Sequence, residues 1–567
     1  MNQTLLYIIT LASPAVFLAT ALFSWFERGL RPSRVKQMAV ASTWISIITA
    51  AISGFFVFNY GMMETALIGA GELGISLRLD SISILMFSMI AIIGLIVVRY
   101  SLNYLDGDNR QGAFIGRLAA TIASVQLFVL SGNLGILFLS WVLTSISLHR
   151  LLIFYKERPG AIVAARKKFI VARLGDACLL AVVLLLYNQF ETGNLEVIFT
   201  ALKNAIATGQ TPEGIEFAAV LLAAAALLKS AQFPLHGWLI EVMETPTPVS
   251  ALLHAGLINA GPFLIIRMAY VMEASTYASM VLIVLGGFTA LFASVVFLTQ
   301  TSVKTALAYS SIAHMGFSLM TCGFGAYAAS MLHLVAHSFY KAHAFLSSGS
   351  VIDTIRSSKV TAAKRIGSPV RIGLGILLGM GLYACFAILW GIDPVKERSL
   401  LVIGAIIALG LSRLFTSALD SNGSPKLILR ASMLSLLVTV LFFTLESGMH
   451  QLLSGHVPEL ASPGIIATIL MGGLLLIFGA TVFIQIVAPV ISATPFSKAW
   501  AIHLRNGLYV NTVFDRTVRS LHSHGTEGKS QVIERLEQIN HKSYANLKQT
   551  HIDNLAPAAT LISKSIS

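Results

Sequence analysis

The sequence predicts an all-α polytopic membrane protein. Only 11% of its 567 residues are charged and 56% are hydrophobic, with a mean hydropathy of +0.78, whereas roughly 25% of the residues are charged in an ordinary soluble protein. A soluble protein of this size cannot bury that much apolar surface, because most of its side chains still face water. The composition therefore excludes a soluble enzyme, a disordered chain and a fibrous protein.

Apolar runs recur along the whole chain, each about 20 residues long, the length that spans about 30 Å of hydrocarbon as a helix. The pattern predicts about 15 transmembrane helices with boundaries uncertain by a few residues. The runs lie near 4–25, 38–60, 82–101, 114–130, 133–153, 168–188, 216–235, 247–272, 277–299, 303–324, 327–350, 370–391, 399–418, 427–446 and 464–490.

Basic residues gather in alternate loops between these runs, and the loops between them are neutral or acidic. The basic loops hold Arg28, Arg31, Arg34 and Lys36; Arg110 and Arg117; Arg150, Lys156, Arg158, Arg166, Lys167 and Lys168; Arg356, Lys359, Lys364, Arg365 and Arg371; Lys426 and Arg430. The acidic loops include Glu191, Glu196, Glu213 and Glu216, and Glu446 and Glu459. The positive-inside rule then predicts an N-terminus outside and a C-terminal tail in the cytoplasm, and it explains the net charge of +13 without nucleic acid.

The chain changes character from about Phe496, where the composition is that of a soluble tail. Val532, Leu536, Ile539 and Leu547 follow helical spacing there and predict a cytoplasmic amphipathic helix. The three cysteines stand singly inside apolar runs, and no His, Cys or Asp spacing predicts a metal site. We expect no metal and no cofactor in this chain.

Lys229 is the sharpest candidate for a functional residue, because an ionisable side chain inside the bilayer costs perhaps 2.5–3.5 kcal/mol. It ends an apolar stretch and precedes Pro234, which interrupts a helix. A charged residue beside a broken helix is how transporters build ion sites. The alternative is a lysine that extends to the membrane interface.

His333, His337 and Lys341 form a second candidate, because a spacing of four residues places all three on one face of a helix. Histidine titrates near neutrality, so such a stripe could pass protons. The alternative is a set of core histidines that hydrogen-bond to neighbouring helices. Lys304 and His343 lie nearby in sequence but on other faces or helices.

Three further residues are candidates with a structural alternative beside each. His254 lies just inside the eighth run. Glu244 could pair with Lys229 or with a base in a loop, while Thr247 and Ser250 could cap a helix. Asp176 is an acid within an apolar run, and an ion pair with Arg173, three residues before it, explains both residues at least as well as a functional role.

Two long motifs resemble the antiporter-type subunits of respiratory complex I and the Mrp cation antiporters. The first runs from Lys229 to Trp238 and continues from Met243 to Ala255, and the second runs from Lys304 to Gly316 and continues from His333 to Ala342. The resemblance covers about residues 78–352. It implies two inverted five-helix repeats with a broken helix, and a proton path in which Lys229 is the central lysine, His254 a water-gating neighbour, and His333, His337 and Lys341 the connecting chain.

The chain also departs from that pattern. Pumping members carry a Trp-Glu pair in the fifth helix, whereas Trp141 is followed here by Val142, Leu143, Thr144 and Ser145. The second broken helix is not recognisable in residues 370–420, where Arg413 is the only membrane cation, and a lateral helix with its own anchor is missing. The expected division is residues 1–110, a first repeat over 111–272, a degenerate second repeat over 273–420, C-terminal helices over 421–495 and the tail over 496–567.

These departures fit one branch of the superfamily. The segments from His236 to Glu244, from His254 to Gly261, from Leu148 to Leu152 and from Ala165 to Phe169 resemble the membrane subunits of the DAB inorganic-carbon accumulation complexes of the bacterial inner membrane. The resemblance implies a DabA-like partner, a zinc subunit similar to β-carbonic anhydrases. It implies that ion movement through this chain, which is not itself an enzyme, drives hydration of CO₂ to bicarbonate in that partner.

Three other functions stay open from the sequence. The chain could be a proton-pumping subunit of an NADH-quinone oxidoreductase, although the missing acid, second lysine motif and anchored lateral helix count against it. It could be an Mrp-type Na⁺/H⁺ antiporter. It could also only anchor its partner, with a vestigial channel.

Overall fold

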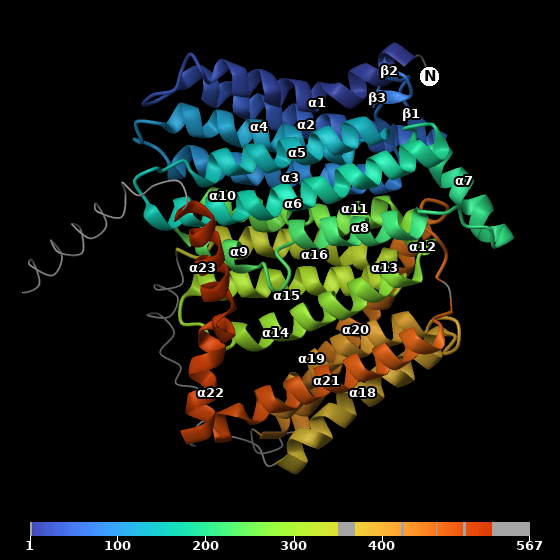
Figure 1. Cartoon of the computed structure of the whole chain (residues 1–567). Coiled ribbons are helices and arrows are strands. Elements are labelled where there is room, and N and C mark those ends of the chain that lie inside the picture. The colour runs from blue at the N-terminus through green and yellow to red at the C-terminus, as the bar shows by residue number, and fades with distance from the viewer. Residues whose placement is uncertain (1–2, 350–368, 421–424, 461, 492–494, 524–567) are drawn as a thin grey trace, which may run out of the picture. The chain divides into compact units, whose positions relative to one another are not determined.

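The computed structural model describes residues 3–349, 369–420, 425–460, 462–491 and 495–523, and most of them are helical (Figure 1). The N-terminal part contains α1 (Gln3–Phe23), α2 (Ser33–Tyr60), α3 (Ser81–Tyr104), α4 (Gln111–Val129), α5 (Leu134–Leu152), α6 (Pro159–Phe190), α7 (Leu195–Thr208) and α8 (Ile215–Lys229). Short segments follow: α9 (Gly237–Glu241), η1 (Val242–Glu244), α10 (Thr247–Leu252), η2 (Leu253–Leu257), α11 (Ala260–Arg267), α12 (Ala269–Glu273), α13 (Thr276–Val281), η3 (Leu282–Gly286) and α14 (Gly287–Phe297). The chain continues with α15 (Val303–Gly323), α16 (Tyr327–Leu346), α18 (Pro369–Trp390), α19 (Arg398–Asp420), α20 (Pro425–Leu453), α21 (Ile465–Ile491), α22 (Pro495–Arg505), η4 (Gly507–Tyr509) and α23 (Val510–Ser523).

Every predicted apolar run coincides with a helix or with consecutive helical segments, so the helical membrane architecture is confirmed. Among the described residues, 11 helices are long and apolar enough to cross a membrane. The helices outside that set include α8, α15 and α16, which carry Lys229, Lys304 and the His333–Lys341 stripe, respectively. The total of about 15 spans and the inverted repeats stay predictions.

Two antiparallel strand pairs, which the sequence did not predict, lie in the connection between α2 and α3. β1 (Met63–Glu64) pairs with β4 (Arg78–Leu79), and β2 (Ile68–Ala70) pairs with β3 (Leu73–Ile75). The strands have only two or three residues each, too few for a recognisable alternation of apolar and polar residues.

Two of the predicted membrane runs contain turns of π-helix. Residues 247–267 form α10, η2 and α11 in succession, and residues 276–297 form α13, η3 and α14, with η2 and η3 as the π-helical parts. A π-helical turn is rare and often marks a functional site. Here η2 contains His254.

Small residues allow close approach around the centre of the bundle. A Cβ atom at Gly261 of α11 would lie 2.2 Å from the Ser230 hydroxyl, and one at Gly316 of α15 would lie 2.6 Å from the backbone oxygen of Gly286 in η3. Transmembrane helices pack through such small residues, because their backbones must come close for dispersion contacts to form. α8 thereby lies against α11, and α15 against η3.

The C-terminal helices α18 to α21 pack against one another and against the rest of the bundle. Tyr383 of α18, Ala405 and Ala408 of α19, and Phe443 of α20 form one buried cluster. α16 contacts α20, and α14 contacts α21. In Figure 1 these helices are the yellow-to-red group beside α14 and α15.

Helix boundaries correct two assignments of loop charges. α6 begins at Pro159, nine residues before the predicted run, so Lys167 and Lys168 lie inside the helix and are 0% and 5% exposed. α20 extends to Leu453, which places Glu446 in the helix as a buried acid. Hydropathy alone cannot predict that a helix continues through charged residues, because it does not register that their charges are paired or hydrogen-bonded inside the protein.

Two amphipathic helices, α7 and α22, are present where the sequence predicted only loop or tail. The predicted tail helix around Val532–Leu547 lies outside the described residues. α23 is a separate unit from residues 1–509.

Candidate functional site

The amine of Lys229 is held by oxygen atoms of α5. Its Nζ atom donates hydrogen bonds to the Ser145 hydroxyl at 2.8 Å, the Thr144 hydroxyl at 2.9 Å and the Trp141 backbone oxygen at 3.1 Å. The same Nζ lies 4.1 Å from the centroid of the Trp141 ring. Three neutral acceptors and one aromatic face therefore stabilise the ammonium.

A further acid and a further base from α6 act on this amine. Asp176 interacts electrostatically with Lys229 and forms the predicted ion pair with Arg173, at 2.6 Å. The buried Lys168 also interacts with Lys229 and donates to the Ser145 backbone oxygen at 2.6 Å. Loss or gain of a proton by Lys229 therefore changes the electrostatic energy of the neighbouring charges on α6.

The break after Lys229 is stabilised by hydrogen bonds from neighbouring segments. Ala231 has a left-handed backbone, with φ of 52°, and the chain then passes through Pro234 to α9. The Ser230 hydroxyl donates to the Ile258 backbone oxygen at 2.8 Å, and the Phe233 amide donates to the Thr289 hydroxyl at 3.2 Å. Backbone groups freed by a break inside a membrane need such partners, so the predicted helix break is present and ordered.

His254 lies fully buried in η2, with its ring stacked on Phe345 of α16 at 4.3 Å between ring centroids. Neither ring nitrogen has a hydrogen-bond partner within the described part of the chain. Lys341, on the same helix as Phe345, acts on His254 electrostatically. The structure thus brings His254 to the face of α16 that carries the predicted stripe.

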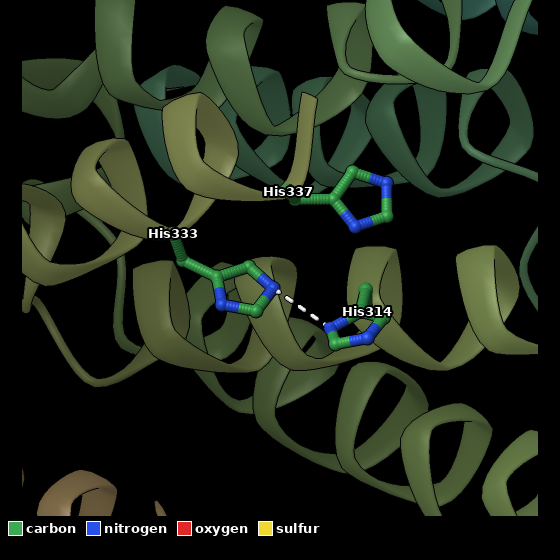
Figure 2. Close-up of side chains that lie close together, drawn as sticks. All are labelled: His314, His333 and His337. Carbon is green, nitrogen blue, oxygen red and sulfur yellow. Dashed lines mark hydrogen bonds between the residues drawn. The ribbon is translucent and has the colours of Figure 1, made fainter. Parts of the chain in front are cut away.

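His333 and His337 of α16 lie beside His314 of α15 (Figure 2). The ring centroids of His333 and His337 are 6.1 Å apart, and the ring of His314 lies 5.1 Å from that of His333 and 5.0 Å from that of His337. Nδ1 of His314 and Nε2 of His333 are at hydrogen-bond distance, 3.2 Å. The sequence interpretation missed His314, although it lies within the Lys304–Gly316 motif.

The two remaining lysines of the motif reach neighbouring helices. Nζ of the buried Lys341 donates to the Leu307 backbone oxygen of α15 at 3.2 Å. Nζ of Lys304 is 3.4 Å from the Thr247 hydroxyl of α10. His343 also belongs to α16, and its side chain is exposed.

Neutral polar side chains link the Lys229 region to the histidines. The Ser230 hydroxyl donates to the backbone oxygen of Ile258. The next residue, Asn259, donates from its side-chain amide to the Ser338 hydroxyl at 2.6 Å, and Ser338 follows His337 in α16. The carbonyl oxygen of the Asn259 side chain is buried without a protein partner among the described residues. Sequence reasoning missed Asn259 and Ser338, because neither residue is ionisable.

Two predicted site residues lie elsewhere. The carboxylate of Glu244 accepts from the Ala161 amide at 3.1 Å, and its backbone oxygen accepts from Arg158. Glu244 therefore caps the N-terminus of α6 and contacts a loop base, because η1 places it there rather than beside Lys229. Arg413 belongs to α19, but its side chain lies outside the part of the chain that the structure describes.

A cavity of about 480 Å³ adjoins the histidines. Its wall includes His314 and His333, and the rest comes largely from apolar residues of α14, α15, α19 and α21, such as Leu291, Phe317 and Phe478. His333 is partly buried, whereas His337 and Lys341 are buried behind it. His314 and His333 therefore line a cavity that is large enough to hold water.

A separate cluster of buried charges was also missed. Asp80 caps α3 and accepts from Arg78 at 2.7 Å and from Arg267 of α11 at 2.5 Å. Arg78 also pairs with Glu196 of α7 at 2.8 Å. These contacts join α3, α7 and α11. In the sequence the same residues appear only as single charges near helix ends, a pattern too common to predict a cluster.

A broken helix with a lysine and a facing row of histidines define an antiporter-type membrane subunit. Residues 131–371 match the family described as NADH:quinone oxidoreductase/Mrp antiporter, and residues 67–115 match the complex I chain 5 N-terminus. The structure is similar to a chain of the Mrp complex from Dietzia sp. DQ12-45-1b, with a TM-score of 0.59 and 21% identity over 94% of this chain and 62% of that one. It is also similar to a chain of an archaeal membrane-bound sulfane sulfur reductase, with a TM-score of 0.55 and 20% identity over 91% and 100%.

Sequence comparison identifies the branch. The chain is 34% identical over 522 residues to the probable inorganic carbon transporter subunit DabB2 of Halothiobacillus neapolitanus, covering 90% of this chain and 93% of that one. It is 42% identical to the probable subunit DabB of Hydrogenovibrio crunogenus, covering 50% of this chain and 54% of that one. The chain belongs to the DabB family.

Proposed function

We propose that this chain is the cation-conducting membrane subunit of a two-component inorganic carbon transporter, with the proton as the cation. It lies in the bacterial inner membrane with its N-terminus outside and its tail in the cytoplasm. Its partner is a DabA-like subunit whose zinc hydrates CO₂ to bicarbonate. Membership of the DabB family supports the inorganic carbon part of this proposal.

One observation carries the cation-conducting part: the series of polar groups from Lys229 to the histidines. Lys229 adjoins Ser230, Ser230 bonds to the segment of Asn259, and Asn259 bonds to Ser338 beside His337. Buried polar atoms without protein partners are costly unless water bridges them. Such atoms occur at Asn259 and His337 along this series, which therefore fits a hydrated route.

The side chains along the route fit proton movement better than the binding of a bare Na⁺ ion. Lysine and histidine exchange protons, whereas they repel a metal cation when protonated. The ammonium of Lys229 has neutral acceptors as its direct partners, so its proton can leave without breaking a tight ion pair. Asp176 supplies compensating charge from α6.

Movement of charge along this route supplies the energy for the partner's reaction. One charge that crosses 100 mV releases roughly 2.3 kcal/mol, so one or two charges suffice to make hydration effectively unidirectional. The coupling element is a switch in this chain at its cytoplasmic contact with the zinc subunit. The hydration chemistry belongs to the partner.

The test is inorganic carbon accumulation by cells that depend on this chain, with Lys229→Met as the variant. The account predicts loss of accumulation while the complex still assembles. Lys426→Met is the matched control, because Lys426 is exposed at the start of α20. Normal accumulation by Lys229→Met would contradict the proposal.

A mild-detergent pull-down with mass spectrometry and zinc analysis tests the partner. One large zinc-bearing protein is the expected companion. Flavin and iron–sulfur subunits, or a set of small antiporter subunits, would contradict this assignment.

The fold similarity to the Mrp complex favours a second candidate, a Na⁺/H⁺ antiporter subunit. Sodium tolerance of cells that lack the chain separates the two functions. Loss of growth at high sodium with normal carbon accumulation would favour the antiporter, and the reverse favours the carbon transporter.

A further inference from the structure

Three imidazole rings meet between α15 and α16, from His314, His333 and His337 (Figure 2). One nitrogen atom from each ring lies within 4.8 Å of one from each of the other two. The closest pair, Nδ1 of His314 and Nε2 of His333, is 3.2 Å apart. The sequence indicated only a row of histidines on α16, so this three-sided arrangement depends on the docking of α15.

We propose that these three histidines form a binding site for a first-row divalent metal ion of the Zn²⁺ type. Zn²⁺ binds histidine nitrogen at about 2.0–2.1 Å in tetrahedral geometry, which places two ligand nitrogens about 3.3 Å apart. The His314–His333 pair already has this separation. The third nitrogen must approach by at most about 1.5 Å to satisfy the same geometry, a movement that side-chain rotation can supply.

The ligand set selects the class of ion. Three neutral imidazoles suit Zn²⁺, Co²⁺, Ni²⁺ or Cu²⁺, whereas Mg²⁺ and Ca²⁺ require oxygen ligands. The group of three candidate ligands contains no carboxylate. Three histidines leave the fourth tetrahedral position free, and the 480 Å³ cavity that His314 and His333 line has room for water or another small ligand there.

The hydrogen bonding of the rings also points to a ligand. Both ring nitrogens of His337 are buried and have no hydrogen-bond partner within the described residues. A bound ion would give one nitrogen atom of each of the three rings a partner. The His314–His333 contact gives a partner to only two of the rings. The nearby Lys341, one helical turn beyond His337, interacts with all three histidines electrostatically, and its charge opposes binding.

Metal binding would occupy His333 and His337 and thereby block the proton route; this consequence rests on the proposed function, whereas the binding site itself does not. The metal is thus an inhibitor of the transport, not a cofactor of it. All three candidate ligands come from this chain.

The test is a Co²⁺ titration of the purified protein in detergent, followed by the visible absorption of tetrahedral Co²⁺. We expect a saturable spectrum from the wild type, and at least a tenfold weaker affinity for His314→Gln and for His333→Gln. His343→Gln is the matched control, because His343 is exposed on the same helix. Lys341→Gln should bind more tightly, because it removes an opposing charge. Thermal unfolding of each variant verifies that it folds.

Absence of a tetrahedral spectrum in the wild type, or an equal affinity in His314→Gln, would overturn the site and leave the proposed function standing. Inhibition of carbon accumulation by added Zn²⁺ is the second measurement. Tight Co²⁺ binding without inhibition would support the site but contradict the route through His333 and His337.

Discussion

Removal of one oxygen from the group that holds Lys229 tests the role of this lysine. Thr144→Val keeps the volume of the side chain and deletes the hydroxyl 2.9 Å from the amine. A hydrogen bond to a charged group contributes about 1.5–3 kcal/mol, and each 1.36 kcal/mol corresponds to tenfold in rate. We expect about a tenfold fall in transport, the lower end of that range, because Ser145 and the Trp141 backbone oxygen still hold the amine.

The assay is uptake of labelled inorganic carbon, with the amount of assembled complex measured in the same membranes. Thr121→Val is the matched control, because its buried hydroxyl donates to the Arg117 backbone oxygen of the same helix. The control should retain wild-type uptake. Uptake by assembled Thr144→Val within twofold of the wild type would refute the account of Lys229.

Three other predictions concern the fold and the extramembrane region. Asp80→Asn removes the paired carboxylate of the buried Arg267 and leaves Arg78 with Glu196 alone, so it should destabilise the protein by about 3–5 kcal/mol, seen as a large fall in Tm; an unchanged Tm would contradict it. Gly316→Ala places a Cβ within 3.0 Å of backbone atoms and should lower the free energy of unfolding by about 1–3 kcal/mol. Gly448→Ala is the control, because its Cβ would meet nothing within 4 Å, and it should not destabilise the protein. Equal effects of the two variants on Tm would argue against the close α15–η3 packing. Burial raises the pKa of Glu64, in β1, above its ordinary value of 4.5, so the contribution of Glu64 to stability is present below that pH and lost as the pH rises through the raised pKa. Glu64→Gln should therefore gain in Tm relative to the wild type above pH 4.5, and a gain confined to lower pH would contradict this sign.

Hydropathy predicted the helices well, because each membrane helix needs a long apolar run whatever its partners are. It failed where polar groups are satisfied inside the bundle. Lys167 and Lys168 are indistinguishable in sequence from loop lysines, yet α6 contains both and Glu241 pairs with Lys167. The short strands and α7 depend on tertiary contacts and have no long period to recognise.

The candidate site was predictable where its residues share a helix. The spacing of His333, His337 and Lys341 places them on one face of α16, and the structure has them there. The place of His314 among them required the packing of α15 on α16. The neutral partners of Lys229 required α6 to pack against both α5 and α8, so that the Lys229 side chain reaches α5. Contacts between distant segments are not encoded in local spacing, so Glu244 could not be assigned to α6 from the sequence.

Proton movement through this chain as the drive for carbon accumulation is the central claim. Its most direct test uses the purified complex in liposomes, with a proton gradient imposed across the membrane and bicarbonate measured inside. The account predicts accumulation that depends on the gradient in the wild type and none in Lys229→Met at equal complex content. Equal accumulation by both proteins, or accumulation that persists after the gradient is collapsed, would contradict it.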